Sequence, residues 1–210
     1  TYLGGGKKKK RSWMINLTGA DTFEADAVII ALPAPQAYGI LLTAQDETDT
    51  LKITRHIDEV DYHPVYSLMA GYAGKELPEW EGIICNDPNL SFISNEALKR
   101  EGKQECSFVI HSTPGFAKSH READPEFIAK ELLASAGRVI GAWAVAPDWT
   151  QVHFWRYSRT KNSISQPFME LNNPDGPLAL VGDYFEGNTV DHAYCSGLSL
   201  ANHWIEKLQA

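Results

Sequence analysis

The chain has 210 residues, of which 43% are hydrophobic and 22% are charged, a composition that excludes a disordered, collagen-like or disulfide-rich protein. Five consecutive basic residues at positions 7–11 make the net charge of the chain less negative than that of its remaining residues. The net charge is −8 overall, and residues 12–210 carry 14 basic against 27 acidic residues, or −13. Such a surface repels phosphate backbones, so nucleic acid is not an expected partner.

The spacing of the cysteines and histidines and the length of the apolar runs also limit which classes of protein are expected. The longest apolar run, residues 27–32, is far too short to cross a bilayer, and no basic-then-apolar leader opens the chain. We therefore expect no membrane anchor. Cys85, Cys106 and Cys195 show no paired spacing, which indicates free thiols and a cytoplasmic location. The seven histidines show no metal-binding spacing, so we expect no metal site.

The beginning of the chain predicts pieces of a sheet. Residues 1–3 and 12–17 predict two strands, with Trp13, Ile15 and Leu17 alternating. Gly4–Gly6 and the basic run between them are typical of a solvated hairpin turn, although such a run also occurs in nuclear-localisation segments. Residues 25–32 predict a buried parallel strand covered on both faces and ended by Pro33. A short helix is expected at 37–42.

The middle of the chain predicts an antiparallel sheet with helices. A helix is expected within 46–60, followed by strands at 65–72, 82–85, 90–94, 106–113 and 151–157. Asp124 and Pro125 predict the cap and first turn of a helix that ends at Gly137. Its expected buried face holds Phe127, Ile128, Leu132 and Leu133.

The end of the chain predicts a buried strand at 178–181 and a long helix at about 189–208. The fold class is therefore a mixed α+β and α/β one. An antiparallel sheet occupies the middle, and the two ends contribute pieces of an open α/β sheet.

The most informative segment joins that last strand to the last helix. Gly182 and Asp183 follow the strand, Gly187 precedes the helix, and small residues recur every four positions at Ala193, Gly197 and Ala201. A smooth helix face lets a planar or phosphate-bearing ligand approach, and the helix start suits an anion. The same residues also suit close packing of the helix on its sheet, so both interpretations remain open. Ser199 within Gly197–Ala201 superficially matches a nucleophile elbow, but it is expected inside a helix.

These residues resemble the C-terminal FAD-binding segment of the flavin amine oxidase superfamily. Residues 25–37 resemble the strand and turn that lead out of that family's FAD domain, and residues 154–158 are similar to a signature of its renalase-like branch. The three blocks stand in the family's order. The resemblance implies an FAD-dependent oxidoreductase that transfers hydride from a small reduced organic substrate to flavin.

The resemblance also implies domains and site residues. It implies partial FAD-domain strands at 1–36, a substrate domain at 37–174 with an antiparallel sheet, and the closing FAD-domain strand and helix at 175–210. The residues implied to contact FAD are Gly182, Asp183, Gly187, Thr189, Val190 and Ala193. The residues implied to bind substrate are Trp155, Arg156 and Tyr157, and no catalytic residue is implied.

One part of the family pattern is missing from this sequence. Gly4 and Gly6 begin a Gly-x-Gly turn, but Lys9 stands where the third glycine is needed and a strand follows instead of a helix. We therefore expect a C-terminal portion, with the N-terminal FAD-binding half supplied by a longer protein or by a separate polypeptide. The alternative is a non-catalytic module that resembles the substrate domain and lacks its own cofactor.

Overall fold

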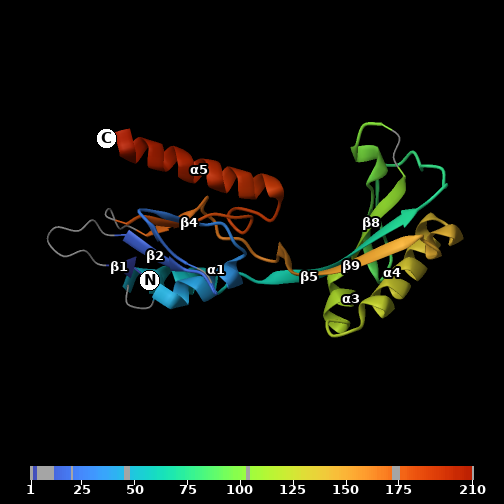
Figure 1. The fold of residues 1–210 in the computed structure, drawn as a ribbon, viewed down its shortest axis with the longest axis horizontal. Coiled ribbons are helices and arrows are strands. Elements are labelled where there is room, and N and C mark those ends of the chain that lie inside the picture. The colour runs from blue at the N-terminus through green and yellow to red at the C-terminus, as the bar shows by residue number, and fades with distance from the viewer. Residues whose placement is uncertain are drawn as a thin grey trace. The chain divides into compact units, whose positions relative to one another are not determined.

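The computed structural model describes residues 2–3, 12–19, 21–44, 48–102, 105–171 and 176–209. The basic run at 7–11 and Gly4–Gly6 lie outside these residues. The chain forms two compact units (Figure 1), each described by itself below. The first combines Thr1–Tyr62 with Arg159–Ala210, and the second is His63–Ser158. These boundaries differ from those expected at 36/37 and 174/175, because the helices after residue 33 and the strand before residue 172 pack in the first unit.

A small antiparallel sheet opens the first unit. Its strands follow the order β1 (Tyr2–Leu3), β2 (Ser12–Asn16) and β3 (Thr22–Ala25), and the first two confirm the expected pair. Trp13 is buried, and its indole Nε1–H donates to the carbonyl of Gly176 at 3.0 Å. The expected alternation does not bury its other members, because Ile15 and Leu17 are both exposed.

A second sheet of the first unit joins distant parts of the sequence. Its order is β10 (Met169–Leu171), β11 (Leu178–Leu180) and β4 (Val28–Ile30), with β4 parallel to β11 and β10 antiparallel to it. β11 is completely buried, as its apolar sequence predicts. β4 confirms the expected parallel strand, but the expectation that both faces are covered is wrong. Ile29 is 52% exposed.

Three helices and a short 3₁₀ turn complete the first unit. They are α1 (Ala34–Leu41), η1 (Leu42–Ala44), α2 (Thr48–Ile57) and α5 (Val190–Gln209), close to the expected ranges. Pro33 caps α1, and Pro35 lies in its first turn, where a fixed φ and a missing N–H are tolerated. The hydroxyl of Tyr62 accepts the Ala34 N–H at 3.1 Å and so satisfies a donor that the helix leaves unpaired.

The second unit is built on a five-stranded antiparallel sheet. The strands follow the order β6 (Gly82–Ile84), β7 (Leu90–Asn95), β8 (Cys106–Ser112), β5 (Tyr62–Tyr72) and β9 (Trp149–Thr160). All five confirm the expected strands. The unit boundary falls inside β5, after Tyr62, and inside β9, after Ser158.

Helices cover one face of this sheet and leave the other face open. Even-numbered residues of β5 and β8 pack with α3 (Pro114–Ser119), α4 (Pro125–Ile140) and η3 (Ala142–Val145) in a core that includes Leu68, Tyr72, Phe108, Ile110 and Leu132. A further short helix, η2 (Ala97–Lys99), follows β7. Because strand side chains alternate, the odd-numbered residues point to the opposite face.

Helix α4 departs from expectation at two residues. Asp124 caps it through the Glu126 N–H, as predicted, but Phe127 is exposed rather than buried. The helix passes through Gly137 and ends before Gly141, whose φ of 116° suits glycine. Gly137 serves close packing, since a Cβ there would lie 2.7 Å from Val145 Cγ1.

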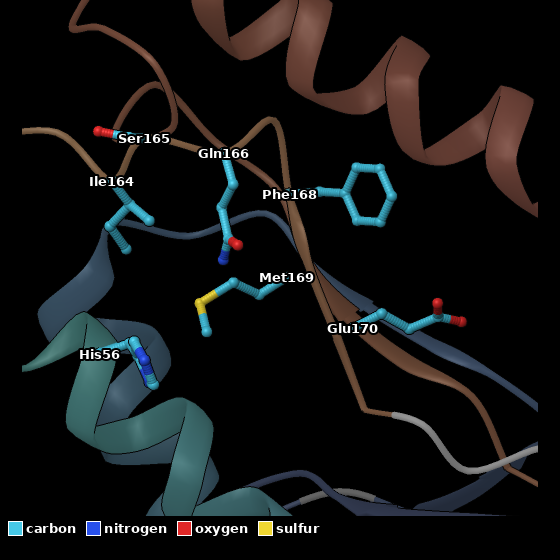
Figure 2. A pocket seen from close by; sticks show the side chains of 7 residues that line it. All are labelled: His56, Ile164, Ser165, Gln166, Phe168, Met169 and Glu170. Atoms are coloured by element: carbon cyan, nitrogen blue, oxygen red, sulfur yellow. The ribbon is translucent and has the colours of Figure 1, made fainter.

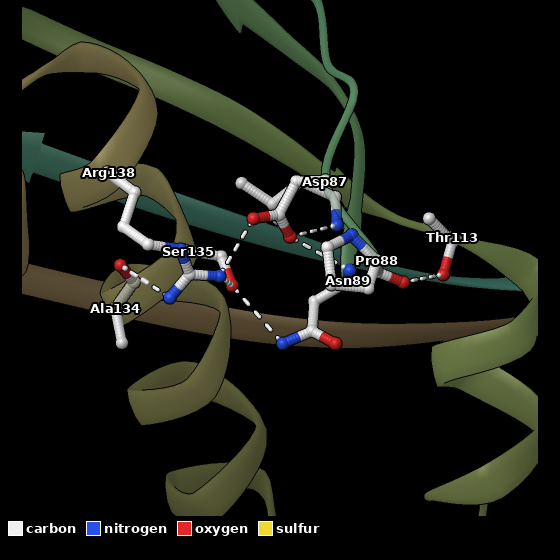
Figure 3. A network of polar contacts seen from close by, with 8 residues as sticks. Asp87, Pro88, Asn89, Thr113, Ala134, Ser135 and Arg138 are labelled. Atoms are coloured by element: carbon white, nitrogen blue, oxygen red, sulfur yellow. Dashed lines mark hydrogen bonds and ion pairs between the residues drawn. The ribbon is translucent and has the colours of Figure 1, made fainter.

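A polar network fastens the turn before β7 to α4 (Figure 3). Arg138 donates to Asp87 Oδ2 at 2.7 Å, while Asp87 Oδ1 accepts the N–H groups of Asn89 and Leu90. Burial tends to raise the pKa of Asp87, but these hydrogen bonds lower it below its usual value. We therefore assign this network a structural role, which is to hold the turn before β7 against α4.

Candidate functional site

Gly182 and Asp183 follow β11 in the loop that leads to α5, the final helix. The Gly182 N–H donates to Ser196 Oγ of α5 at 3.1 Å. A Cβ at Gly182 would lie 2.7 Å from the ring of Tyr184, so a larger residue here would displace that ring. Asp183 is half-buried, and this burial raises the pKa of its carboxyl group above the ordinary value. The carboxylate is thus an acceptor held partly away from water.

Gly187 and Thr189 shape the start of α5. A Cβ at Gly187 would overlap the imidazole ring of His192, which lies over this glycine. Thr189 Oγ1 accepts the His192 N–H at 3.4 Å and contacts His192 Nδ1 at 2.7 Å, and the Thr189 carbonyl accepts the Ala193 N–H. Thr189 is therefore the helix cap. Val190, the first helical residue, is 86% exposed.

Two of the small residues of α5, Gly197 and Ala201, are not covered by other described residues. A Cβ at Gly197 would meet nothing within 4 Å, and Ala201 is exposed. The two interpretations of this face can therefore be separated. Contacts within the chain account for Gly182, next to the Tyr184 ring, and for Gly187, next to the His192 ring, but not for Gly197, where there is room for a ligand or another polypeptide.

Two buried tyrosines lie near Asp183. Tyr184 is completely buried, and its hydroxyl has no hydrogen-bond partner among the described residues. Burial raises the pKa of Tyr184, with further contributions from Tyr62 and Asp183. Burial also raises the pKa of Tyr62 to about 12. Sequence reasoning missed both tyrosines, since nothing in the sequence shows that a tyrosine of the loop after β11 and one at the start of β5 lie near each other.

The open face of the five-stranded sheet carries a second candidate site. A groove of about 700 Å³ is lined by residues from three strands, β5, β8 and β9: Ser67, Met69, Val109, His111, Gln151, His153, Trp155, Tyr157 and Ser158. The sequence placed Trp155 and Tyr157 on one face of a strand, and they do share this groove. Arg156 is exposed and is not among the residues that line it.

A hydrogen bond and the register of the strands place Trp155, Ser67 and His111 next to one another across this groove. The Trp155 Nε1–H donates to Ser67 Oγ at 3.0 Å, and Ser67 pairs with His111 across β5 and β8. The ring of His153 packs edge-to-face on the ring of Trp155, with the two ring centroids 4.2 Å apart. Burial lowers the pKa of His111, so its imidazole is uncharged at neutral pH. Sequence reasoning missed Ser67 and His111, although the alternation of their strands puts both on the face opposite the core.

A smaller cavity of about 430 Å³ lies in the first unit, among α2, β10 and the segment before β10. Figure 2 shows Met169 pointing toward His56 of α2, while Phe168 and Glu170 point toward α5. Glu170 accepts hydrogen bonds from Trp204 at 2.9 Å and Lys207 at 2.9 Å, and it contacts His203 at 3.0 Å. These contacts hold α5 on β10, so we assign Glu170 a structural role.

Other classes of site receive no support from the described residues. They hold no group of three histidine, cysteine or acidic side chains arranged for a metal ion, and none of their helices is long and apolar enough to cross a membrane. Ser199 lies inside α5, which confirms that it is not at a strand-to-helix elbow.

Residues 10–204 match the family described as "Flavin containing amine oxidoreductase". Among curated proteins, mouse (Mus musculus) renalase is 26% identical over 202 residues, which cover 91% of this chain and 58% of renalase. The chain thus spans little more than half the length of this relative.

Solved structures of two oxidases share the fold. Cyclohexylamine oxidase from Brevibacterium oxydans IH-35A has a TM-score of 0.59 at 10% identity, over 96% of this chain and 47% of that one. Wild-type putrescine oxidase bound to putrescine has a TM-score of 0.58 at 16% identity, over 94% of this chain and 46% of that one.

Proposed function

Because this chain belongs to the flavin-containing amine oxidoreductase family, we propose that it is the C-terminal part of an FAD-dependent oxidoreductase of the renalase-like type. In this proposal the first unit is part of a Rossmann-like FAD-binding domain, and the second unit is the substrate domain. The observation that carries it is the uncovered small-residue face of α5 beside Asp183 and an exposed first helical turn.

The residues around the start of α5 fit one end of a flavin cofactor. The first N–H groups of any helix have no partner inside it and carry partial positive charge, which suits an electron-rich ring edge. Thr189 and Val190 stand at this turn, while the Ala193 N–H is already paired with the Thr189 carbonyl, so Ala193 offers only its small side chain. The open space outside Gly197 leaves room for a flat group. Asp183 supplies a half-buried acceptor for hydroxyl groups, while Gly182 and Gly187 keep the loop close to the helix.

The protein residues have positioning roles in this proposal. FAD, when bound, supplies the hydride acceptor. The first turn of α5 orients the electron-rich edge of the cofactor, and Asp183 holds its polyol. Trp155 and Tyr157 give the substrate an apolar surface that excludes water. Arg156 was expected to bind substrate, but it lies outside this groove and is left out of the proposal.

The substitution Asp183→Asn tests the proposal in the full product of the gene. It removes the charge but keeps the shape, so we expect flavin retained after purification to fall several-fold while the unfolding temperature changes little. The measurement is flavin absorbance per mole of protein. The matched control is Asp21→Asn, at an exposed residue of the β2–β3 turn, which should leave flavin content unchanged. Equal flavin content in all three proteins would contradict the assignment of Asp183.

A second candidate function is a binding module without a cofactor. One observation favours it: the groove on the open sheet face is lined entirely by residues 67–158, so ligand binding there requires no dinucleotide motif. If the full gene product is colourless and added FAD does not bind to it, this function replaces the oxidoreductase.

A further inference from the structure

The second unit has another cavity, which follows the C-terminal end of β5. Its volume is about 580 Å³, within the range of small-molecule sites. Its lining comes from the segment between β5 and β6, from the last residue of α4 and from η3, and includes Lys75, Glu76, Leu77, Trp80, Ile140 and Trp143. We call it the tryptophan cavity. It shares no lining residue with the groove on the open sheet face, so the two are separate sites.

The core of the second unit holds both tryptophans of this cavity in place. The ring of Trp80 stacks on that of Phe108, with the two centroids 5.2 Å apart and an angle of 21° between the ring planes. Trp143 contacts the same Phe108 ring and packs edge-to-face on Tyr72, with centroids 6.0 Å and 5.1 Å apart. Phe108 and Tyr72 are almost completely buried, whereas both tryptophans are only partly buried. The two indole rings are therefore fixed in position before a ligand arrives, which lowers the entropy cost of binding.

The charges around the tryptophan cavity favour a cation. Glu76 lines the cavity and is exposed, and no described residue forms an ion pair with its carboxylate. Glu79 and Glu81, on either side of Trp80 in the sequence, are also exposed. Lys75 is the one basic residue in the lining. Three carboxylates against one ammonium group give a negative local potential, which attracts a cation and repels an anion.

The apolar part of the lining also fits a cation, provided that the cation carries alkyl groups. The face of an indole ring has partial negative charge and attracts a cation placed over it, and tryptophan is the strongest aromatic residue in this respect. Leu77 and Ile140 add aliphatic surface to the same cavity. A strongly hydrated metal ion gains little from such a surface, whereas an alkylated ammonium ion has both the charge and the apolar contact area.

We propose that the tryptophan cavity binds a small, free alkylated ammonium ion. Its charge lies against the indole rings of Trp80 and Trp143 and near the carboxylate of Glu76, and its alkyl groups contact Leu77 and Ile140. The proposal concerns binding at a site that the oxidoreductase proposal does not use. It depends on neither flavin nor turnover, so its failure would leave the proposed function untouched.

The first experiment compares choline with its neutral carbon analogue, in which a carbon atom replaces the ammonium nitrogen and the shape is kept. The full gene product is isotope-labelled at tryptophan, and nuclear magnetic resonance follows the indole N–H signals, assigned by single Trp→Phe variants. Millimolar choline should shift the signals of Trp80 and Trp143. The neutral analogue should bind at least about fivefold more weakly. Trp155, in the groove, is the internal control, and its signal should stay unchanged.

Three results of this titration would overturn the proposal. Unchanged Trp80 and Trp143 signals in choline would show that the cavity does not bind the cation. Equal affinity for the neutral analogue would show an apolar cavity without a preference for charge. A shift confined to Trp155 would assign the cation to the groove instead.

The second experiment neutralises two adjacent residues of opposite charge. At low ionic strength, Glu76→Gln should weaken choline binding several-fold, whereas Lys75→Gln should strengthen it several-fold, because each changes the local potential in the opposite direction. Both residues are exposed, so the unfolding temperature should change little. Glu122→Gln, at a side chain that is 94% exposed in the loop before α4, is the matched control and should leave the affinity unchanged. Equal affinities in all four proteins would contradict the proposal, as would weaker binding after Lys75→Gln.

Discussion

At the scale of single residues, glycines that look alike in the sequence have different roles. A side chain at Gly182 would approach Tyr184 and one at Gly187 would overlap His192, whereas one at Gly197 meets open space. The first two are therefore explained by packing within the chain. Of these three glycines, Gly197 alone is not explained by a neighbouring side chain, so substitution of Gly197 is the most direct test for an external ligand at this face.

The substitution Gly197→Ala distinguishes an effect on the stability of the fold from an effect on ligand binding. Alanine within a helix stabilises it by about 0.5–1 kcal/mol relative to glycine, so the isolated chain should unfold at a slightly higher temperature. If flavin lies against this face, the full product should nevertheless bind FAD more weakly. Gly39→Ala is the matched control, because Gly39 is also helical with open space around it, in α1. It should raise stability without changing FAD affinity, and a parallel result at Gly197 would count against the flavin site.

The orientation of Trp155 depends on one hydrogen bond, from its Nε1–H to Ser67 Oγ. Trp155→Phe and Ser67→Ala both remove this bond. Ligand affinity for the groove, followed by fluorescence or calorimetry with a small aromatic probe such as benzamide, should fall in each single variant. The loss in the double variant should be clearly smaller than the sum of the two single losses. Fully additive losses would show that the two side chains act independently.

At the scale of secondary-structure elements, Glu170 links β10 to α5. Its side chain is only 14% exposed and accepts from Trp204 and Lys207. Burial tends to raise the pKa of Glu170, but the hydrogen bonds from Lys207, Trp204 and His203 outweigh it and lower the pKa below its usual value. A carboxyl group with a lowered pKa stabilises the folded state when it is ionised.

The stabilisation from Glu170 should therefore be complete above about pH 4.5 and lost as the pH falls through the lower pKa of the folded state. Glu170→Gln should cost about 2 kcal/mol at pH 7 and less as the pH falls through the pKa of the folded state, with pH 3 as the acid condition. The measurement is urea unfolding at both pH values. Lys207→Ala is the comparison, since Lys207 is about half exposed and its loss should cost less than about 1 kcal/mol. A cost of Glu170→Gln that does not depend on pH would contradict this account.

Local patterns in the sequence predicted most of these helices and strands, but not every element boundary and not the burial of every side chain. The turn residues that flank 106–113 and the Asp124–Pro125 cap identified β8 and the start of α4, because both signals act between near neighbours. The end of α4 was missed since Gly137 packs against Val145, a tertiary contact. The exposure of Ile29 was missed because an apolar strand does not reveal whether its covering layer is present.

The candidate site was predictable to a similar extent. Residues close together in the sequence, from Gly182 to Ala193, do form one loop and helix start. Ser67 and His111 were missed because they join Trp155 only through the register of three strands.

At the scale of the whole molecule, the second unit is one uninterrupted segment with its own core. All residues of its main hydrophobic cluster fall within His63–Ser158. We predict that this fragment, produced alone, folds with a single cooperative thermal transition and a near-ultraviolet circular dichroism signal from its packed aromatic rings. Leu132→Ala, at a completely buried residue, should lower its stability by about 2–5 kcal/mol. A fragment without a cooperative transition would contradict independent folding.

The division of the first unit between Thr1–Tyr62 and Arg159–Ala210 has a consequence during synthesis on the ribosome. The second unit is fully translated once Ser158 has been added, so it is able to fold while the first unit still lacks β10, β11 and α5. At about 5–20 residues per second, β4 waits about one to four more seconds after Ser158 for its partner strand β11. During that interval the apolar segment around Ile29 is exposed to chaperones and to neighbouring nascent chains, and synonymous codons that slow translation after residue 158 would lengthen its exposure.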